Sequence, residues 1–177
     1  DGFLMTPTGM RLDALNPARL SQLDADGVHA GGDPPTKEAA LHLAMYASRP
    51  KAQAIIHLHG SQSVALSLLA DLNPDDVLPA YTAYFVMRVG RLRMLPYFAP
   101  GDLSLAKAVG EASQHASALL LAHHGPVVAG ASLEAAADTA EELEQTAAIH
   151  FHLHGKACRC LSPSQRDALL ARFPPSV

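Results

Sequence analysis

The sequence predicts an α/β or α+β domain in which helices cover a central sheet. Apolar runs of strand length occur at Ala54–Gly60 and Leu119–Gly130, and they alternate with stretches of helical periodicity. The chain has 177 residues, of which 49% are hydrophobic and 17% charged. That length suits one sizeable core and is too short for two ordinary domains, so we expect a single domain over residues 1–177.

Bulk composition excludes several classes of protein. The net charge of −4 and the absence of a dense Lys/Arg run argue against nucleic acid or an anionic membrane as the partner. No apolar run approaches transmembrane length, and we expect no signal peptide. Cys158 and Cys160 are the only cysteines, so a reducing cytoplasm is the simplest location. This C-x-C pair is either metal-binding or, as we favour, two idle thiols.

The chain opens with a short predicted strand, Phe3–Met5, followed by a Thr-Pro-Thr-Gly turn. Pro7 restricts one dihedral angle and Gly9 permits a positive one, so N–H groups near Thr8 and Gly9 can turn outward together and hold an anion. An ordinary strand-ending turn is the alternative. Next, the sequence predicts a short helix capped by Asn16 and a hairpin turn at 24–27.

A longer helix is predicted to start at Pro34, with Asp33 as its N-cap. This places Glu38 in the first turn, where a carboxylate suits the helix dipole and can reach a cation. Free N–H groups at the same helix end favour phosphate near Thr36 and Lys37. The lysine adds a full positive charge, which suits a substrate with a second anionic group.

Two histidines, His57 and His59, interrupt the apolar run at 54–60. In a strand their side chains project to one side, while Ile56 and Leu58 point to the other. They are therefore either a pair of metal ligands or histidines that face water. His124 ends the second apolar run, just before a Gly-Pro break that must turn the chain.

Three imidazoles and the Glu38 carboxylate together make a plausible catalytic zinc site. His123 would point away from His124 if the strand continued, so we exclude it as a ligand. Beyond the first histidine pair, a helix is predicted at 61–72. Residues 77–95 contain Tyr84, which is either a core aromatic residue or a proton donor. The same stretch contains the arginines 88, 91 and 93, which are either solvated or bind an anionic group.

Three further helices are predicted at 103–117, from a Ser132 cap to about Gly155, and at 162–173. The second contains His150, His152 and His154. Residues two apart on a helix diverge by about 200°, so only His150 and His154 could share a metal. A helix C-terminus favours cationic side chains, and we prefer that structural explanation for this cluster.

The motifs P-T-K-E-x-x-x-H, H-L-H and A-H-H-G, in this order, resemble those of the class II aldolase/adducin-head family. The resemblance spans nearly the whole chain, and the family includes zinc-dependent fuculose-phosphate and ribulose-phosphate enzymes. It implies a three-layer α/β/α fold with a central mixed or antiparallel sheet, and a homotetramer. It also implies that a family segment with a Gly-Asn phosphate element is missing before Asp1, which agrees with a start that lacks methionine.

The resemblance implies roles for individual residues. The zinc ligands would be His57, His59 and His124, and Glu38 would be the acid/base that also touches the metal. Tyr84 would donate a proton, within its own subunit or across a subunit boundary. The substrate phosphate would contact Thr8, Gly9, Thr36 and Lys37.

Within the family, the segments 35–46, 74–78, 82–90, 96–102 and 123–130 are most similar to 3-oxo-tetronate 4-phosphate decarboxylases. This subgroup implies zinc-dependent release of CO2 through a metal-stabilised enediolate, giving dihydroxyacetone phosphate in four-carbon sugar-acid catabolism. Gly60 stands where this subgroup usually has serine, and His123 stands where it usually has asparagine. The alternatives are a fuculose-phosphate type aldolase, a ribulose-phosphate epimerase, or a non-catalytic adducin-like scaffold, which lacks the zinc histidines.

Overall fold

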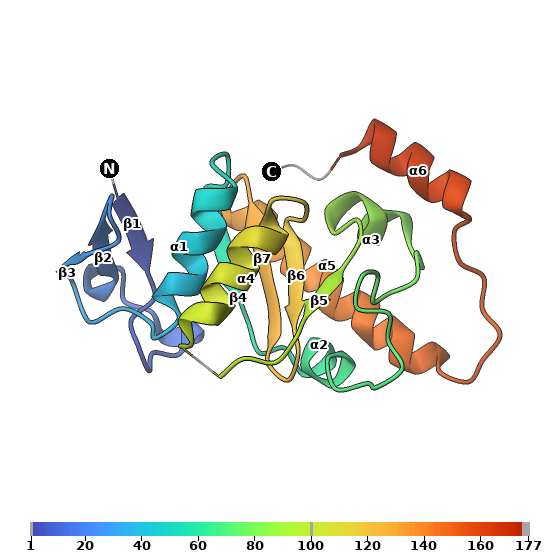
Figure 1. Cartoon of the computed structure of the whole chain (residues 1–177), viewed down its shortest axis with the longest axis horizontal. Coiled ribbons are helices and arrows are strands. Elements are labelled where there is room, and N and C mark those ends of the chain that lie inside the picture. The colour runs from blue at the N-terminus through green and yellow to red at the C-terminus, as the bar shows by residue number, and fades with distance from the viewer. Residues whose placement is uncertain (1, 100, 175–177) are drawn as a thin grey trace.

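The computed structural model describes residues 2–99 and 101–174, so Asp1 and Pro100 lie outside the described residues. Its main sheet has the strand order β4-β7-β6-β5 (Figure 1). The strands are β4 (Ala54–His57), β7 (Gly125–Gly130), β6 (Ala118–Leu121) and β5 (Arg93–Leu95). β7 is antiparallel to both of its neighbours, whereas β5 is parallel to β6. The sheet is therefore mixed, as predicted.

Helices cover both faces of this sheet, and the residues of β6 alternate between them. Leu119 and Leu121 pack with α1 (Ala39–Ser48) and α4 (Leu103–Ser113), which lie side by side in Figure 1. Ala118 and Leu120 pack on the other side with α2 (Ser61–Leu66), α3 (Ala83–Arg88) and α5 (Leu133–Leu153). Because successive strand residues face opposite sides, one strand contributes to two hydrophobic cores. The result is the expected three-layer α/β/α arrangement.

A second, smaller sheet is formed near the N-terminus by β1 (Gly2–Met5), β2 (Ser21–Asp24) and β3 (His29–Gly31), all antiparallel. Two short 3-10 helices, η1 (Leu12–Ala14) and η2 (Pro17–Arg19), connect β1 to β2. The Asn16 side chain accepts the Ala18 N–H, which confirms the predicted cap. A bridge between Pro7 and Pro35 ties this region to the segment that leads into α1.

Three predicted helix boundaries are wrong, and one of them is the end of α4, which lies at Ser113 rather than Ser117. α1 begins at Ala39 rather than Pro34, because the preceding residues are extended: Pro35 forms the bridge and the Thr36 N–H donates to the Thr6 carbonyl at 3.1 Å. α2 ends at Leu66 rather than Leu72. There the Ser67 hydroxyl donates to the Val64 carbonyl at 2.7 Å, and such a side-chain bond competes with helical hydrogen bonding.

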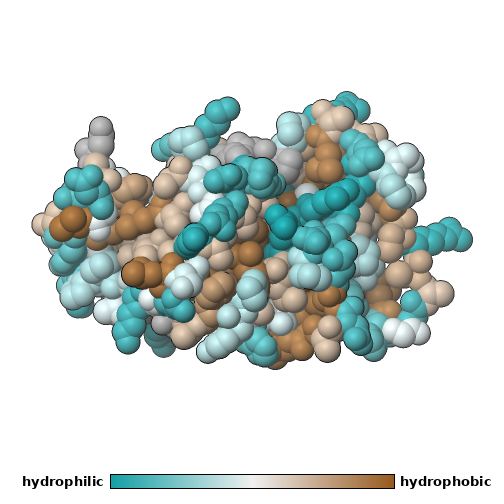
Figure 2. Space-filling view, in the orientation of Figure 1, coloured by the Kyte–Doolittle hydropathy of each residue, from teal (hydrophilic) through white to brown (hydrophobic). Residues whose placement is uncertain are grey.

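The C-terminal helices agree with the sequence. Ser132 caps α5 through the Ala135 N–H, and Ser162 forms a capping box with Gln165 at the start of α6 (Pro163–Arg172). Arg166 anchors α6 by two bonds to Asp76, at 2.6 and 3.0 Å. Across the described part of the chain, every helix is too short or too polar to cross a membrane. Figure 2 shows hydrophilic residues interspersed with hydrophobic ones on the face that carries α1 and α4.

Candidate metal centre

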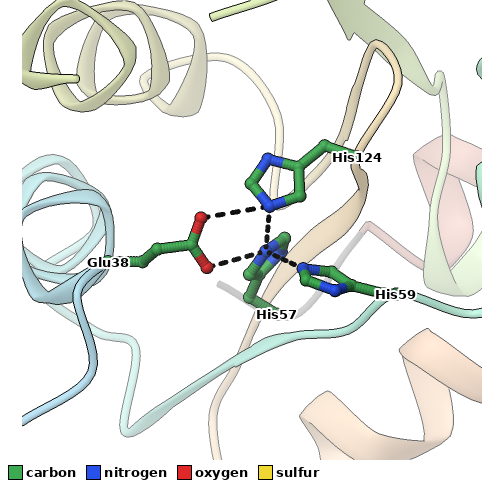
Figure 3. Close-up of side chains that lie close together, drawn as sticks. All are labelled: Glu38, His57, His59 and His124. Atoms are coloured by element: carbon green, nitrogen blue, oxygen red, sulfur yellow. Dashed lines mark hydrogen bonds and ion pairs between the residues drawn. The ribbon is translucent and has the colours of Figure 1, made fainter. Parts of the chain in front are cut away.

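Four side chains from three separate segments converge on one point: Glu38, His57, His59 and His124 (Figure 3). The Nε2 atom of His57 lies 3.2 Å from that of His59 and 3.3 Å from that of His124. The two Glu38 oxygens lie 3.2 Å from His57 Nε2 and 3.1 Å from His124 Nε2. One ligand atom from each residue can be chosen so that all four lie within 4.8 Å of one another.

His57 is the last residue of β4, and a backbone contact determines which ring nitrogen is protonated. Its Nδ1 donates to the Pro126 carbonyl of β7, at 2.8 Å. The carbonyl can only accept, so Nδ1 carries the hydrogen and Nε2 of the neutral ring has a free lone pair. This lone pair points at the other two imidazoles and at Glu38. The ring itself is only 4% exposed.

His59 follows β4 rather than belonging to it, because the ladder with β7 ends at the pair His57–Val127. Both imidazoles nevertheless lie on the same side, as predicted, with their Nε2 atoms in contact. His124 lies in the turn between β6 and β7. Gly125, with φ of 141°, begins β7 so close to the Leu58 carbonyl that a side chain would overlap it. This close approach brings His124 against the His57–His59 segment.

The structure corrects two expectations about this turn. The chain reverses at 122–124, before the Gly-Pro pair, and Pro126 belongs to strand β7. His123 is therefore in a turn, with φ of 60°, and not in a continuing strand. Its ring does lie outside the four-residue cluster, next to Tyr97, but the reason is the turn rather than strand alternation.

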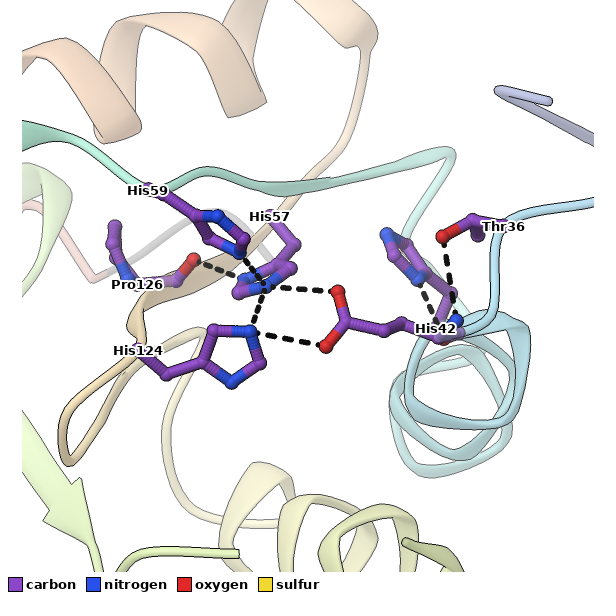
Figure 4. A network of polar contacts seen from close by, with 7 residues as sticks. Thr36, His42, His57, His59, His124 and Pro126 are labelled. Carbon is purple, nitrogen blue, oxygen red and sulfur yellow. Dashed lines mark hydrogen bonds and ion pairs between the residues drawn. The ribbon is translucent and has the colours of Figure 1, made fainter. Parts of the chain in front are cut away.

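Glu38 occupies the N-cap position of α1, one residue before the helix rather than inside its first turn. Its N–H donates to the Thr36 hydroxyl at 3.3 Å, and its carbonyl accepts from His42 Nδ1 at 3.0 Å (Figure 4). These two contacts fix the backbone on both sides of the carboxylate. Sequence reasoning assigned no role to His42, although its spacing of one helical turn from Glu38 was a usable signal.

The electrostatics of the cluster favour an ionised Glu38 and a neutral His124. Contact with the His57 ring lowers the pKa of Glu38, and this effect exceeds the opposing effect of burial. Burial lowers the pKa of His124 and, separately, that of His42. Glu38 Oε1 is buried and has no partner with hydrogen-bond geometry, although His124 Nε2 is nearby. A cation between these atoms would satisfy them all.

The donor set fits a divalent metal ion. Three unprotonated imidazole nitrogens and a carboxylate oxygen are ligands that zinc accepts in catalytic sites, and imidazole also suits other first-row metals. Histidine ligands usually donate their second ring nitrogen to a carbonyl or carboxylate, as His57 does here to Pro126. The four ligand side chains fit a bound metal, and so does the hydrogen bond that orients the His57 ring.

Comparison with known proteins shows the family to which this chain belongs. The model of the class II aldolase and adducin N-terminal domain matches residues 1–151. The chain belongs to this family. A curated relative, the 3-oxo-tetronate 4-phosphate decarboxylase of Haemophilus influenzae, is 45% identical over 92% of this chain and 77% of its own length. The L-fuculose phosphate aldolase of the same organism is 31% identical, over 98% of this chain and 79% of its own length.

Solved structures agree with this assignment. The crystal structure of YgbL from Escherichia coli superimposes with a TM-score of 0.92 at 42% identity, covering 95% of this chain and 81% of that one. The fold of this chain is thus that of the class II aldolases. With decarboxylases and aldolases as its close relatives, the chain is an enzyme, a metal-dependent carbon–carbon lyase of the class II aldolase family.

The residues expected to bind phosphate lie side by side at the edge of this class II aldolase site. The Thr8–Gly9 turn is joined to the segment before Glu38, since the Thr8 N–H donates to the Pro34 carbonyl at 3.0 Å. This corrects the expectation that the Thr8 amide is free. The Thr36 amide is also occupied, whereas the Gly9 N–H has no partner in the described ranges. Lys37 is exposed beside them.

Other candidates lie outside the cluster. Tyr84 is on α3, 62% exposed, and its hydroxyl has no hydrogen bond to the described residues. Arg88 pairs with Asp138 and Arg93 with Asp75, so both have structural partners. His150 accepts or donates a bond at 3.0 Å to Tyr81. The two cysteines are free and exposed.

Proposed function

We propose that this protein decarboxylates 3-oxo-tetronate 4-phosphate to dihydroxyacetone phosphate and CO2. The convergence of Glu38 with three histidine Nε2 atoms carries the proposal, because it supports a metal centre that can stabilise negative charge on a substrate oxygen. The relatives named for this decarboxylation, at 45% identity, support the choice of reaction. Four-carbon sugar-acid breakdown would be the context.

The chemistry needs charge stabilisation first and a proton afterwards. The bond between C1 and C2 of the 3-oxo acid breaks, CO2 leaves, and its electron pair forms an enediolate over C2 and C3. A divalent ion, which we propose to be zinc, would bind substrate oxygens and offset this charge. One proton then goes to C2 and gives dihydroxyacetone phosphate. No base is needed to start the reaction.

We assign the residues as follows. His57, His59 and His124 hold the metal, and Glu38 shares in holding it and moves a proton to or from the substrate. The bond to Pro126 places the hydrogen of the neutral His57 ring on Nδ1 and so leaves the Nε2 lone pair for the metal. The phosphate contacts the Gly9 N–H, the Thr8 and Thr36 hydroxyls and the Lys37 ammonium group, at the edge of the site next to Glu38.

Tyr84 is proposed as a proton donor that acts from a neighbouring subunit of a homotetramer. Its 62% exposure and the lack of a partner for its hydroxyl in the described residues agree with a contact made by assembly. We place the enzyme in the cytoplasm, where its two free, exposed cysteines stay reduced.

A coupled assay on zinc-loaded protein tests the proposal. 3-Oxo-tetronate 4-phosphate is supplied and dihydroxyacetone phosphate is followed, with a parallel sample treated with chelator. We expect rapid, metal-dependent product. The second candidate is a retro-aldol cleavage, supported by 31% identity to an L-fuculose phosphate aldolase and by the enediolate common to both reactions. Product from fuculose phosphate or epimerised ribulose phosphate, with none from the oxo acid, would overturn the decarboxylase.

A further inference from the structure

Two of the three histidines of the candidate metal centre lie outside regular strands. β4 ends at His57, so His59 follows the ladder, and His124 lies between the end of β6 at Leu121 and the start of β7 at Gly125. His57 is held by strand pairing and by the Pro126 carbonyl. The positions of the other two imidazoles depend on contacts beyond the sheet. The short helix α2 supplies a contact to each segment.

The first turn of α2, directly after His59 and Gly60, is bonded to Glu144 of α5. One Glu144 oxygen accepts the Gln62 N–H at 2.7 Å, and the other accepts the Ser63 N–H at 3.0 Å and the Ser63 hydroxyl at 2.7 Å. Hydrogen bonds to an ionised carboxylate are stronger than those between neutral groups. Ser63 is fully buried, so water does not replace these bonds easily.

Gly60 leaves the space that the Glu144 carboxylate occupies. Its backbone angles, φ of −63° and ψ of 137°, are open to any residue, so the backbone does not require glycine. A Cβ atom at this position would, however, lie 2.7 Å from Glu144 Cδ and overlap one carboxylate oxygen. The absence of a side chain next to His59 is therefore what lets Glu144 reach the first turn of α2.

The other end of α2 holds the turn that carries His124. The Ser67 hydroxyl accepts the N–H of His123 at 3.1 Å and donates to the Val64 carbonyl at 2.7 Å. Ser67 is 4% exposed. His123 has a positive φ, a conformation that costs free energy for a residue other than glycine and persists when its surroundings hold it. The bond to Ser67 is such a restraint, one residue from His124.

We propose that Glu144 and Ser67 are positioning residues of the metal centre, acting through the two ends of α2 on His59 and on His124. Neither belongs to the four residues that converge on the metal position. The inference rests on the proposed metal centre but not on the identity of the substrate. Loss of a hydrogen bond made directly to a metal ligand typically weakens metal binding tenfold to a hundredfold, and Glu144 and Ser67 act one contact further out, so we expect the lower end of this range.

The test is a cobalt titration of the metal-free full chain, followed by visible absorption, for the unchanged protein and for Ser67→Ala and Glu144→Gln. The control is Thr139→Val, a buried residue of α5 whose hydroxyl bonds only the Ala135 carbonyl of its own helix. We expect each positioning variant to raise the Kd for cobalt about tenfold or more and to change the absorption bands that report ligand geometry. The control should change neither, whatever its melting temperature.

Each outcome decides something different. If both positioning variants lower the melting temperature but keep the cobalt Kd and spectrum, Glu144 and Ser67 are merely structural and the proposal is wrong. If the unchanged protein binds no cobalt or zinc, the metal centre itself fails, and the positioning roles fail with it. If the variants lose affinity as expected while no substrate is decarboxylated, the positioning roles stand and only the proposed reaction is overturned.

Discussion

The Nδ1 atom of His57 donates a hydrogen bond to the carbonyl oxygen of Pro126, 2.8 Å away on the neighbouring strand. Pro126 lies two residues after His124, so one bond joins the segments that carry two of the converging imidazoles. The bond also determines which nitrogen of His57 is free. It therefore links the register of β4 and β7 to the chemistry available at the site.

Glu38→Gln should fold normally and lose most turnover. Glutamine is nearly the same size but cannot transfer the proton, and loss of such a group typically costs about two to four orders of magnitude in rate. The measurement is kcat on metal-loaded protein, with Glu111→Gln, an exposed carboxylate on α4, as the matched control. Undiminished kcat in Glu38→Gln would remove this carboxylate from the mechanism.

Lys37→Ser should raise KM for the phosphorylated substrate about fivefold and leave the melting temperature unchanged. The side chain is exposed, so its contact with a phosphate is screened and contributes about 1 kcal/mol. Lys51→Ser, another exposed lysine, serves as the control. Equal KM values for the two variants would contradict a role for Lys37 in substrate binding.

Tyr84→Phe should lower kcat if the hydroxyl acts across a subunit boundary, and mixing should then restore activity. Subunits with Tyr84→Phe and subunits with Glu38→Gln are each impaired, but a mixed oligomer contains some sites with both intact groups. We expect activity to reappear after the two proteins are unfolded and refolded together. Mixtures that stay as inactive as their components would rule out this arrangement.

The metal-free protein should lose stability as the pH falls. Burial lowers the pKa of His124 from 6.5, so below that pH the unfolded chain binds a proton that the folded chain resists. Contact with His57 lowers the pKa of Glu38 from 4.5, and the resulting stability is present above pH 4.5 and is lost as the pH falls through the folded value. Both effects have the same sign. Melting temperatures from about pH 8 to pH 3 test both effects, and His124→Asn should flatten the curve near pH 6.

Gly60→Ala should weaken cobalt binding in the unchanged background but much less in a Glu144→Ala background. The added methyl group displaces the Glu144 carboxylate from Ser63, and this effect disappears once the carboxylate is gone. Residues in contact give non-additive changes of this kind. The four cobalt Kd values of this double-mutant cycle provide the measurement, and strictly additive changes would show that the two residues act independently.

Much of the fold was predictable from local pattern. The caps at Asn16 and Ser132 act at the positions that the sequence indicates, because a cap needs only a side chain and an N–H two or three residues away. The start of α1 was not predictable in this way. Asp33 and Pro34 form a good helix start, but the bridge between Pro7 and Pro35 keeps that segment extended, and this pairing involves a residue 28 positions earlier.

For the site, local pattern in the sequence indicated the types of ligand and the side to which the His57 and His59 imidazoles project. Short-range sterics fix that alternation wherever the chain is extended. The sequence also pointed to His124 rather than His123, but only the folded chain shows that Gly125 packs against the Leu58 carbonyl to bring His124 to this pair, and that Glu144 and Ser67 bond the two ends of α2. These contacts depend on strand order and on packing between residues far apart in sequence, which no local periodicity encodes.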